Sequence, residues 1–132
     1  MTVTDPIADM ICVMKNAWRV KKDTVLITHS HIKTDIIKLL QQEGFISRYE
    51  LVKDDNRDKI KVYLKYNEDG QSIITDMVRR STPGKREYLA KQAIPKIKSG
   101  FGVSILTTNK GVLTGKQARM QNVGGEMLCH IW

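Results

Sequence analysis

The sequence predicts an α+β fold in which a small N-terminal α/β domain, residues 1–66, packs on a β-rich C-terminal domain, residues 67–132. Apolar residues recur at helical spacing through most of the first 44 residues, and the period changes to two from Phe45 onward. A polar turn cluster at residues 67–70 separates these segments from shorter, more strand-like ones. A length of 132 residues suits one compact unit or two small, closely packed ones.

The first helix is predicted to begin at Thr4-Asp5-Pro6 and to run to about Arg19. A capping hydroxyl or carboxylate precedes a proline, whose missing N–H does no harm in the first turn of a helix. The apolar stripe behind this start consists of Ile7, Met10, Ile11 and Met14.

A short strand at residues 24–27 and a second helix are predicted next. Ser30 is the predicted N-cap of that helix, and Gly44 is its predicted end. Its apolar face consists of Ile32, Ile36, Ile37 and Leu40.

A hairpin completes the first domain. Residues 45–52 and 59–66 alternate in polarity, and residues 54–58 are predicted to join them as a loop. We expect a small α/β layer in which the helices cover one face of the sheet.

The second half is predicted to be mainly antiparallel β structure. The expected elements are a strand at 73–80, a turn at 81–84, a strand at 87–90, a brief helical piece at 94–97, a strand at 102–107, a helix at 115–121 and a strand at 126–132.

Positive charge is concentrated in one part of the chain, which has a net charge of +8. Residues 79–119 hold ten basic residues against a single acid, Glu87, for a net charge of +9. A soluble lysine-rich surface is one explanation. A block this one-sided favours a polyanionic partner, and nucleic acid ahead of an acidic membrane.

No residue pattern indicates an enzyme, a metal site or a bound cofactor. Cys12 and Cys129 are far apart in the sequence, and we expect both to be free, buried thiols. The spacing of His29 and His31 does not suit a pair of metal ligands. Neither a phosphate-binding P-loop nor paired catalytic carboxylates are found. The longest apolar runs are too short to cross a bilayer, and the first ten residues do not resemble a signal peptide, so we expect a soluble, cytosolic protein.

The turn formed by Thr107, Thr108, Asn109, Lys110 and Gly111 clusters small polar side chains beside a lysine and a glycine. Such side chains can hydrogen-bond phosphate and ribose oxygens in the shallow minor groove of RNA. The same residues would also form an ordinary hairpin turn without any ligand. The pattern alone leaves both interpretations open.

Several short motifs follow one another along the chain. They are T-D-P-I-A-D-M (4–10), K-N-A (15–17), E-G-F-I (43–46), L-K-Y (64–66), S-x-P-G-x-R-x-Y (81–88), I-P-x-I-x-x-G-x-G (94–102), I-L-x-T-x-x-G-V-L-T (105–114), A-R (118–119) and G-G-E (124–126). Through these motifs the whole chain resembles the family of the bacterial-type small-subunit ribosomal protein eight.

The resemblance implies a structural, non-enzymatic protein of the small ribosomal subunit. It implies direct binding to the central domain of small-subunit ribosomal RNA, support of subunit assembly, and contact with neighbouring proteins, including protein five. It also implies possible repression of the protein's own messenger RNA. A stand-alone RNA-binding repressor is the main alternative, and a protein of an organellar rather than a cytoplasmic ribosome is another.

The resemblance also implies which residues bind RNA. The inferred contacts are Thr107, Thr108, Asn109, Lys110, Gly111, Gly124, Gly125, Glu126, Arg86, Tyr88, Thr4, Asp5, Lys15, Asn16, Ser30 and Lys33. Asn109 replaces the serine that is usual in the family, and Gly115 and Gln117 replace the usual acids after the turn. Cys129 and His130 replace the usual small residue and aromatic residue.

Overall fold

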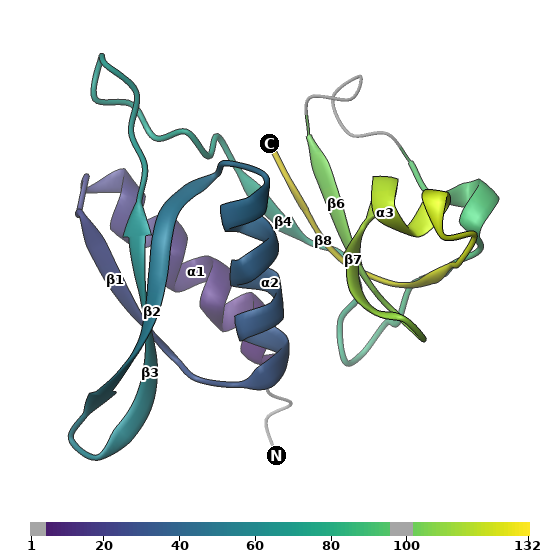
Figure 1. Ribbon diagram of the computed structural model, residues 1–132, viewed down its shortest axis with the longest axis horizontal. Helices are drawn as coiled ribbons and strands as arrows, with labels where there is room; N and C mark the ends of the chain where they lie inside the picture. Colours follow the sequence, from purple (N-terminus) through teal and green to yellow (C-terminus); the bar gives the residue numbers. More distant parts are fainter. Residues whose placement is uncertain (1–4, 96–101) are drawn as a thin grey trace. The chain divides into compact units, whose positions relative to one another are not determined.

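The computed structural model describes residues 5–95 and 102–132. The chain divides into two compact units, which we call the α/β unit (Asp9–Thr75) and the β-rich unit (Met1–Ala8 with Asp76–Trp132). Both contain helices and antiparallel strands, and this confirms the predicted α+β class (Figure 1). The polar turn after Tyr66, where the sequence predicts a domain boundary, lies inside the α/β unit and is closed by a bridge between Tyr66 and Ser72.

Both predicted N-terminal helices are confirmed. Helix α1 (Pro6–Arg19) begins where Asp5 Oδ1 accepts a hydrogen bond from the Ala8 backbone N–H at 3.2 Å. Helix α2 (His31–Gln42) begins at Ser30, whose Oγ accepts from the Lys33 backbone N–H at 3.2 Å. Each cap satisfies a backbone donor that the first helical turn leaves without a partner.

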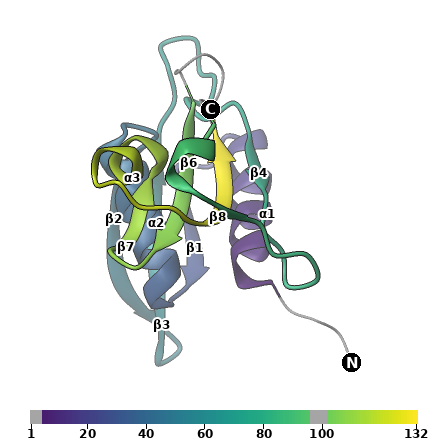
Figure 2. The ribbon, with the colours of Figure 1, turned by 90° about the vertical axis from the view of Figure 1, so that its right-hand side faces the viewer.

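The α/β unit contains a three-stranded antiparallel sheet with the order β1-β3-β2. Its strands are β1 (Thr24–Thr28), β2 (Ile46–Asp54) and β3 (Arg57–Leu64). Ile60, Val62 and Leu64 are buried on one face of β3, and α1 and α2 lie on one side of the sheet (Figures 1 and 2).

The hairpin between β2 and β3 is tighter than predicted. Asp54 pairs with Arg57, so only Asp55 and Asn56 form the loop, with φ angles of 51° and 63°. Aspartate and asparagine tolerate this left-handed conformation, which matches the twist of the flanking strands.

The β-rich unit is built on an antiparallel sheet with the order β4-β8-β6-β7, in which β5 also pairs with β8. Its strands are β4 (Met77–Arg79), β5 (Tyr88–Leu89), β6 (Val103–Thr108), β7 (Gly111–Thr114) and β8 (Gly125–Ile131). Helix α3 (Gly115–Met120), which confirms the predicted helix, starts at a capping box between Thr114 and Gln117 and contacts β6 and β7. Ile94, Leu106, Ala118 and Met127 form a buried apolar cluster.

Two predictions for this unit need correction. The strand expected at 73–80 is limited to β4, which begins only at Met77. The helical piece expected at 94–97 instead precedes Ile94 as the 3-10 helix η1 (Lys91–Ala93). Ile94 is extended, with ψ of 118°, because a following proline disfavours the helical conformation. Residues 96–97 lie outside the described residues.

Over the described ranges, 5–95 and 102–132, no helix combines the length and apolarity required to cross a membrane.

His130 on β8 should make folding sensitive to pH. Its Nε2 is buried and has no hydrogen-bond partner among the described residues. Burial, reinforced by Arg80 and only partly offset by Glu87, lowers the pKa of His130. The unfolded chain, with a histidine pKa of about 6.5, therefore binds a proton more readily than the folded chain.

We therefore expect the free energy of unfolding to decrease as the pH falls below about 6.5. The free energy of unfolding, measured by urea denaturation, should decrease less between pH 7.5 and pH 5 in His130→Gln than in the wild type. His31→Gln, which removes an exposed histidine, should keep the wild-type difference. An equal decrease in all three proteins would contradict this role of His130.

Candidate nucleic-acid interface

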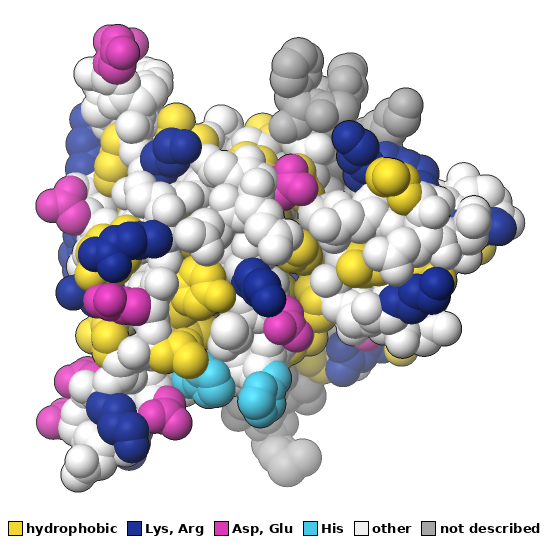
Figure 3. Space-filling view, viewed as in Figure 1, with side chains coloured by type: hydrophobic (Ala, Val, Ile, Leu, Met, Phe, Trp, Pro, Cys, Tyr) yellow, Lys and Arg dark blue, Asp and Glu magenta, His cyan; other side chains and the backbone are white. Residues whose placement is uncertain are grey.

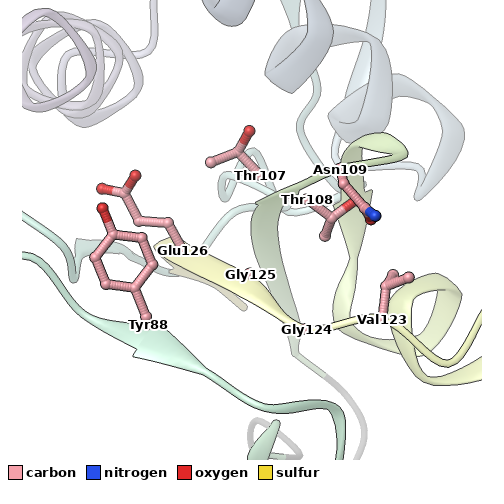
Figure 4. Close-up of a pocket in the computed structure, with 8 residues that line it drawn as sticks. All are labelled: Tyr88, Thr107, Thr108, Asn109, Val123, Gly124, Gly125 and Glu126. Carbon is pink, nitrogen blue, oxygen red and sulfur yellow. The ribbon is translucent and has the colours of Figure 1, made fainter.

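A concave site in the β-rich unit brings together most of the RNA-binding residues that were predicted for the second half of the chain (Figure 4). Its lining consists of Tyr88, Thr107, Thr108, Asn109, Val123, Gly124, Gly125 and Glu126. We call it the tip pocket. Strand β8 assembles it, because Glu126 pairs with Tyr88 of β5 on one side and with Thr107 of β6 on the other. Residues directly opposite one another point to the same face of a sheet, so these three side chains form one row.

Tyr88 supplies an aromatic wall to the tip pocket. The residue is 69% exposed, although aromatic rings usually avoid water. In Figure 4 its ring lies beside the Glu126 carboxylate. An exposed ring in this position can stack on an unpaired base.

The two glycines of the pocket allow the strands to approach closely. A Cβ atom on Gly125 would collide with the backbone carbonyl oxygen of Thr107, and one on Gly124 with that of Leu89. Backbone atoms cannot swing aside as a long side chain can. Both positions therefore require glycine for space.

The Glu126 carboxylate is held in place by two donors. Ser81 Oγ donates to Glu126 Oε2 at 2.6 Å, and an Arg86 guanidinium N–H donates to the same oxygen at 2.9 Å. Ser81 is fully buried, and its Oγ accepts from the Glu87 backbone N–H at 3.0 Å. The other carboxylate oxygen, Oε1, has no hydrogen bond within the described part of the chain, so it can accept one from a ligand.

These contacts keep Glu126 ionised. Burial by itself would raise the pKa of Glu126, but the hydrogen bonds from Ser81 and Arg86 and the charges of Arg86 and Arg79 outweigh it and lower the pKa. A carboxylate whose ionised form is favoured in this way suits a base amine or a sugar hydroxyl, whereas it repels a phosphate.

The turn between β6 and β7 is stabilised by hydrogen bonds of its own, as the hairpin interpretation of its sequence requires. Thr108 Oγ1 donates to the Gly111 carbonyl at 2.8 Å and accepts from the Lys110 backbone N–H at 3.0 Å. Gly111 has a φ of 105°, which side chains rarely tolerate. Thr108 and Gly111 therefore build the turn.

Thr107 and Asn109 are the polar side chains of the turn that are available to a ligand. Within residues 5–95 and 102–132 neither makes a side-chain hydrogen bond, and Asn109 is exposed. Lys110 is exposed as well and has no acidic partner there.

Of the RNA contacts predicted in the first half of the chain, those among the described residues do not line the tip pocket. Asp5, in the β-rich unit, forms an ion pair with Arg79 at 3.0 Å. In the α/β unit Ser30 is a helix cap and Lys33 is buried, with Nζ donating to the Thr28 carbonyl at 3.3 Å. On α1, Lys15 is half-buried and Asn16 is exposed. Thr4 lies outside the described residues.

Ser81 and Val123 belong to the site although the sequence did not predict them there. Ser81 lies 45 residues before Glu126. No local spacing could have indicated their hydrogen bond, because only the pairing of β8 with its neighbours brings them together.

The described residues offer no candidate metal centre. Across the described residues no group of three or more His, Cys, Asp or Glu side chains could hold a metal ion. Cys129 is buried as predicted, whereas Cys12 is exposed, so the prediction of two buried thiols is wrong for Cys12. Burial, only partly opposed by Arg79, raises the pKa of the Cys129 thiol to about 12. A thiol in this state is a poor nucleophile.

Both a protein-family model and individual known proteins match the sequence of this chain. The family model described as "Ribosomal protein S8" matches residues 5–132. The chain belongs to the ribosomal protein S8 family. This confirms the resemblance inferred from the motifs and the expectation of a structural, non-enzymatic component.

Individual relatives match over the full length. The small ribosomal subunit protein uS8 of Clostridioides difficile (strain 630) is 45% identical over 132 residues, the whole of both chains. The uS8 of Thermodesulfovibrio yellowstonii is 46% identical over 130 residues, 98% of this chain and 99% of that one. The uS8 of Halothermothrix orenii is 41% identical over the whole of both chains.

The close approach at Gly125 predicts that Gly125→Ala lowers the free energy of unfolding by about 1–3 kcal/mol, because β6 and β8 must move apart. Gly84→Ala is the matched control, since a Cβ there meets nothing within 4 Å, and it should change stability by less than about 0.5 kcal/mol. Chemical denaturation measures both. Equal effects would rule out the steric role of Gly125.

The hydrogen bond from Ser81 predicts that Ser81→Ala raises the pKa of Glu126. In the folded wild type this pKa is lowered, so ionised Glu126 stabilises the fold above its unfolded pKa of about 4.3, and this contribution is lost as the pH falls through the folded pKa.

An NMR titration of the Glu126 carboxyl carbon should show the higher midpoint in Ser81→Ala. Thr82→Ala removes a hydroxyl of the same turn that bonds Lys85 instead, and it should leave the midpoint where it is in the wild type. An unshifted midpoint in Ser81→Ala would exclude this hydrogen bond.

Proposed function

We propose that this protein is a structural constituent of the small ribosomal subunit that binds the central domain of small-subunit ribosomal RNA through the tip pocket. The observation that carries the proposal is the row formed by Tyr88, Glu126 and Thr107 across three strands. The row offers an aromatic face, an ionised acceptor and a hydroxyl side by side. Unpaired RNA bases are recognised by stacking and by hydrogen bonds to their edges, so this combination suits an irregular RNA helix.

Charge supports an RNA partner. The β-rich unit carries ten basic and four acidic residues, a net charge of +6, whereas the α/β unit carries twelve and ten, a net charge of +2. In the view of Figure 3, acidic side chains gather over the part that holds β1–β3, while Lys and Arg predominate over α3, β6 and β7. This field would attract a phosphate backbone to the unit that holds the tip pocket.

The relatives that match this chain over its full or nearly full length are named as small ribosomal subunit proteins. Their names support the proposed role.

The finer expectations belong to the same proposal. They are residence in cytoplasmic ribosomes, early action in subunit assembly, contact with small-subunit protein five, and repression of the protein's own messenger RNA through the same pocket. Sedimentation separates the ribosomal role from that of a stand-alone repressor, because only the former requires the protein in salt-washed small subunits.

The decisive experiment is binding of the full chain to a central-domain ribosomal RNA fragment, with footprinting. We expect Thr107→Val, which replaces the hydroxyl by a methyl group, to weaken specific binding by about 1–3 kcal/mol because a desolvated polar partner is left unpaired. Thr24→Val on β1 is the matched control, a half-buried strand threonine of the other unit, and it should bind like the wild type.

Thr108→Val is not an equivalent test, since Thr108 holds the turn together and its loss would affect folding and binding together. Wild-type affinity of a correctly folded Thr107→Val protein would contradict the proposed pocket. Absence of a footprint on the central domain would contradict the RNA target itself.

A further inference from the structure

A second concave site lies outside the tip pocket and contains mostly basic side chains. Its lining consists of Arg79, Arg80, Lys85, Arg86 and Glu87. We call it the basic pocket. All five residues come from the end of β4 and the segment that joins β4 to β5.

The backbone around the basic pocket is tightly held. Thr82 and Lys85 exchange two backbone hydrogen bonds of 3.0 Å, and the Lys85 N–H also donates to Thr82 Oγ1 at 3.1 Å. On the side of β8, the Arg80 N–H donates to the Leu128 carbonyl at 3.0 Å, and the Ser81 N–H donates to the Met127 carbonyl at 2.9 Å. The positions from which the basic side chains leave the backbone are therefore fixed before any ligand arrives.

Three of the four basic side chains are oriented by acids. Arg79 pairs with Asp5 at 3.0 Å, Arg80 with Glu87 at 3.2 Å and Arg86 with Glu126 at 2.9 Å. The side chains of Arg80 and Arg86 are still 43% and 48% exposed. A guanidinium has five N–H donors, so each of these two keeps donors for a ligand.

Lys85 differs from the arginines because it is exposed and has no acidic partner among the described residues. The lining therefore combines two pre-oriented, half-exposed guanidinium groups with one ammonium group that is not neutralised locally. The four bases and Glu87 give the lining a net charge of +3. Guanidinium and ammonium groups are the usual ligands of phosphate oxygens.

We propose that the basic pocket binds a phosphate group of the RNA backbone through Lys85, Arg80 and Arg86. The inference rests on the proposed function and extends it. Arg86 belongs to both sites, because its guanidinium lines the basic pocket and also holds Glu126 of the tip pocket. The tip pocket repels phosphate through its ionised carboxylate and reads bases, whereas the basic pocket takes the backbone and carries no sequence information.

The test is the salt dependence of RNA binding by the full chain. Lys85→Gln removes the charge without leaving an acid unpaired. Loss of one phosphate contact should reduce the slope of log affinity against log salt by about 0.7–0.9 and weaken binding up to about eightfold near 0.1 M salt. The effect should be the same for the central-domain fragment and for an unrelated RNA duplex.

Lys116→Gln is the matched control. Lys116 is exposed on α3 in the same unit but does not line the pocket, so this change removes the same net charge without touching the site. It should leave the slope at the wild-type value. Equal slopes in Lys85→Gln and Lys116→Gln would overturn the proposal, because only the general field of the unit would then attract RNA.

The two proposals fail in distinguishable ways. If Thr107→Val loses specific binding while Lys85→Gln behaves like its control, the tip pocket stands and the basic pocket is refuted. If the central-domain fragment binds no better than the unrelated duplex, yet Lys85→Gln lowers the slope on both, the proposed function fails and the phosphate site stands. Capture on phosphatidylglycerol vesicles that depends on Lys85, with RNA binding that does not, would refute an RNA phosphate as the ligand.

Discussion

Strand β8 is the element on which the rest of the β-rich unit depends. It pairs with β6 along one edge and with β4 and β5 along the other. Segments that are distant in the sequence therefore meet along a single strand. The approach of β6 is so close that Gly125 has no room for a side chain. Any larger residue there would separate Thr107 from Glu126, and the row that forms the tip pocket would be lost.

The same strand places a carboxylate in a strongly basic unit. Glu126 is tolerated because Ser81 and Arg86 donate to it, and together with the nearby positive charges they outweigh the cost of partial burial. Arg86 in turn is not simply a surface cation, since its orientation is set by Glu126. The ion pair between Arg86 and Glu126 thus gives the two pockets different chemistry. Glu126 provides a hydrogen-bond acceptor in the tip pocket, and Arg86 provides donors in the basic pocket.

The turn at Thr107 to Gly111 assigns its structural role and its proposed recognition role to different residues. The Thr108 hydroxyl is hydrogen-bonded within the turn, and Gly111 adopts the left-handed backbone conformation that the turn requires. Thr107 and Asn109 flank these residues and keep their polar groups unbonded within the described ranges. The folding role and the proposed binding role therefore belong to different residues rather than competing for the same ones.

Sequence by itself determined the local elements of this protein. Asp5 with Pro6 and Ser30 mark the helix starts, and alternation marks β2 and β3, because caps and periodicity depend only on neighbours within a few residues. Family motifs indicated the turn and Gly124 to Glu126 as a site. Only the tertiary structure decided that Ser81 holds Glu126 and that Lys33 is buried, because both depend on contacts between residues that are distant in the sequence. The end of η1 before Ile94 is a local effect of Pro95 instead, so the sequence already contained it.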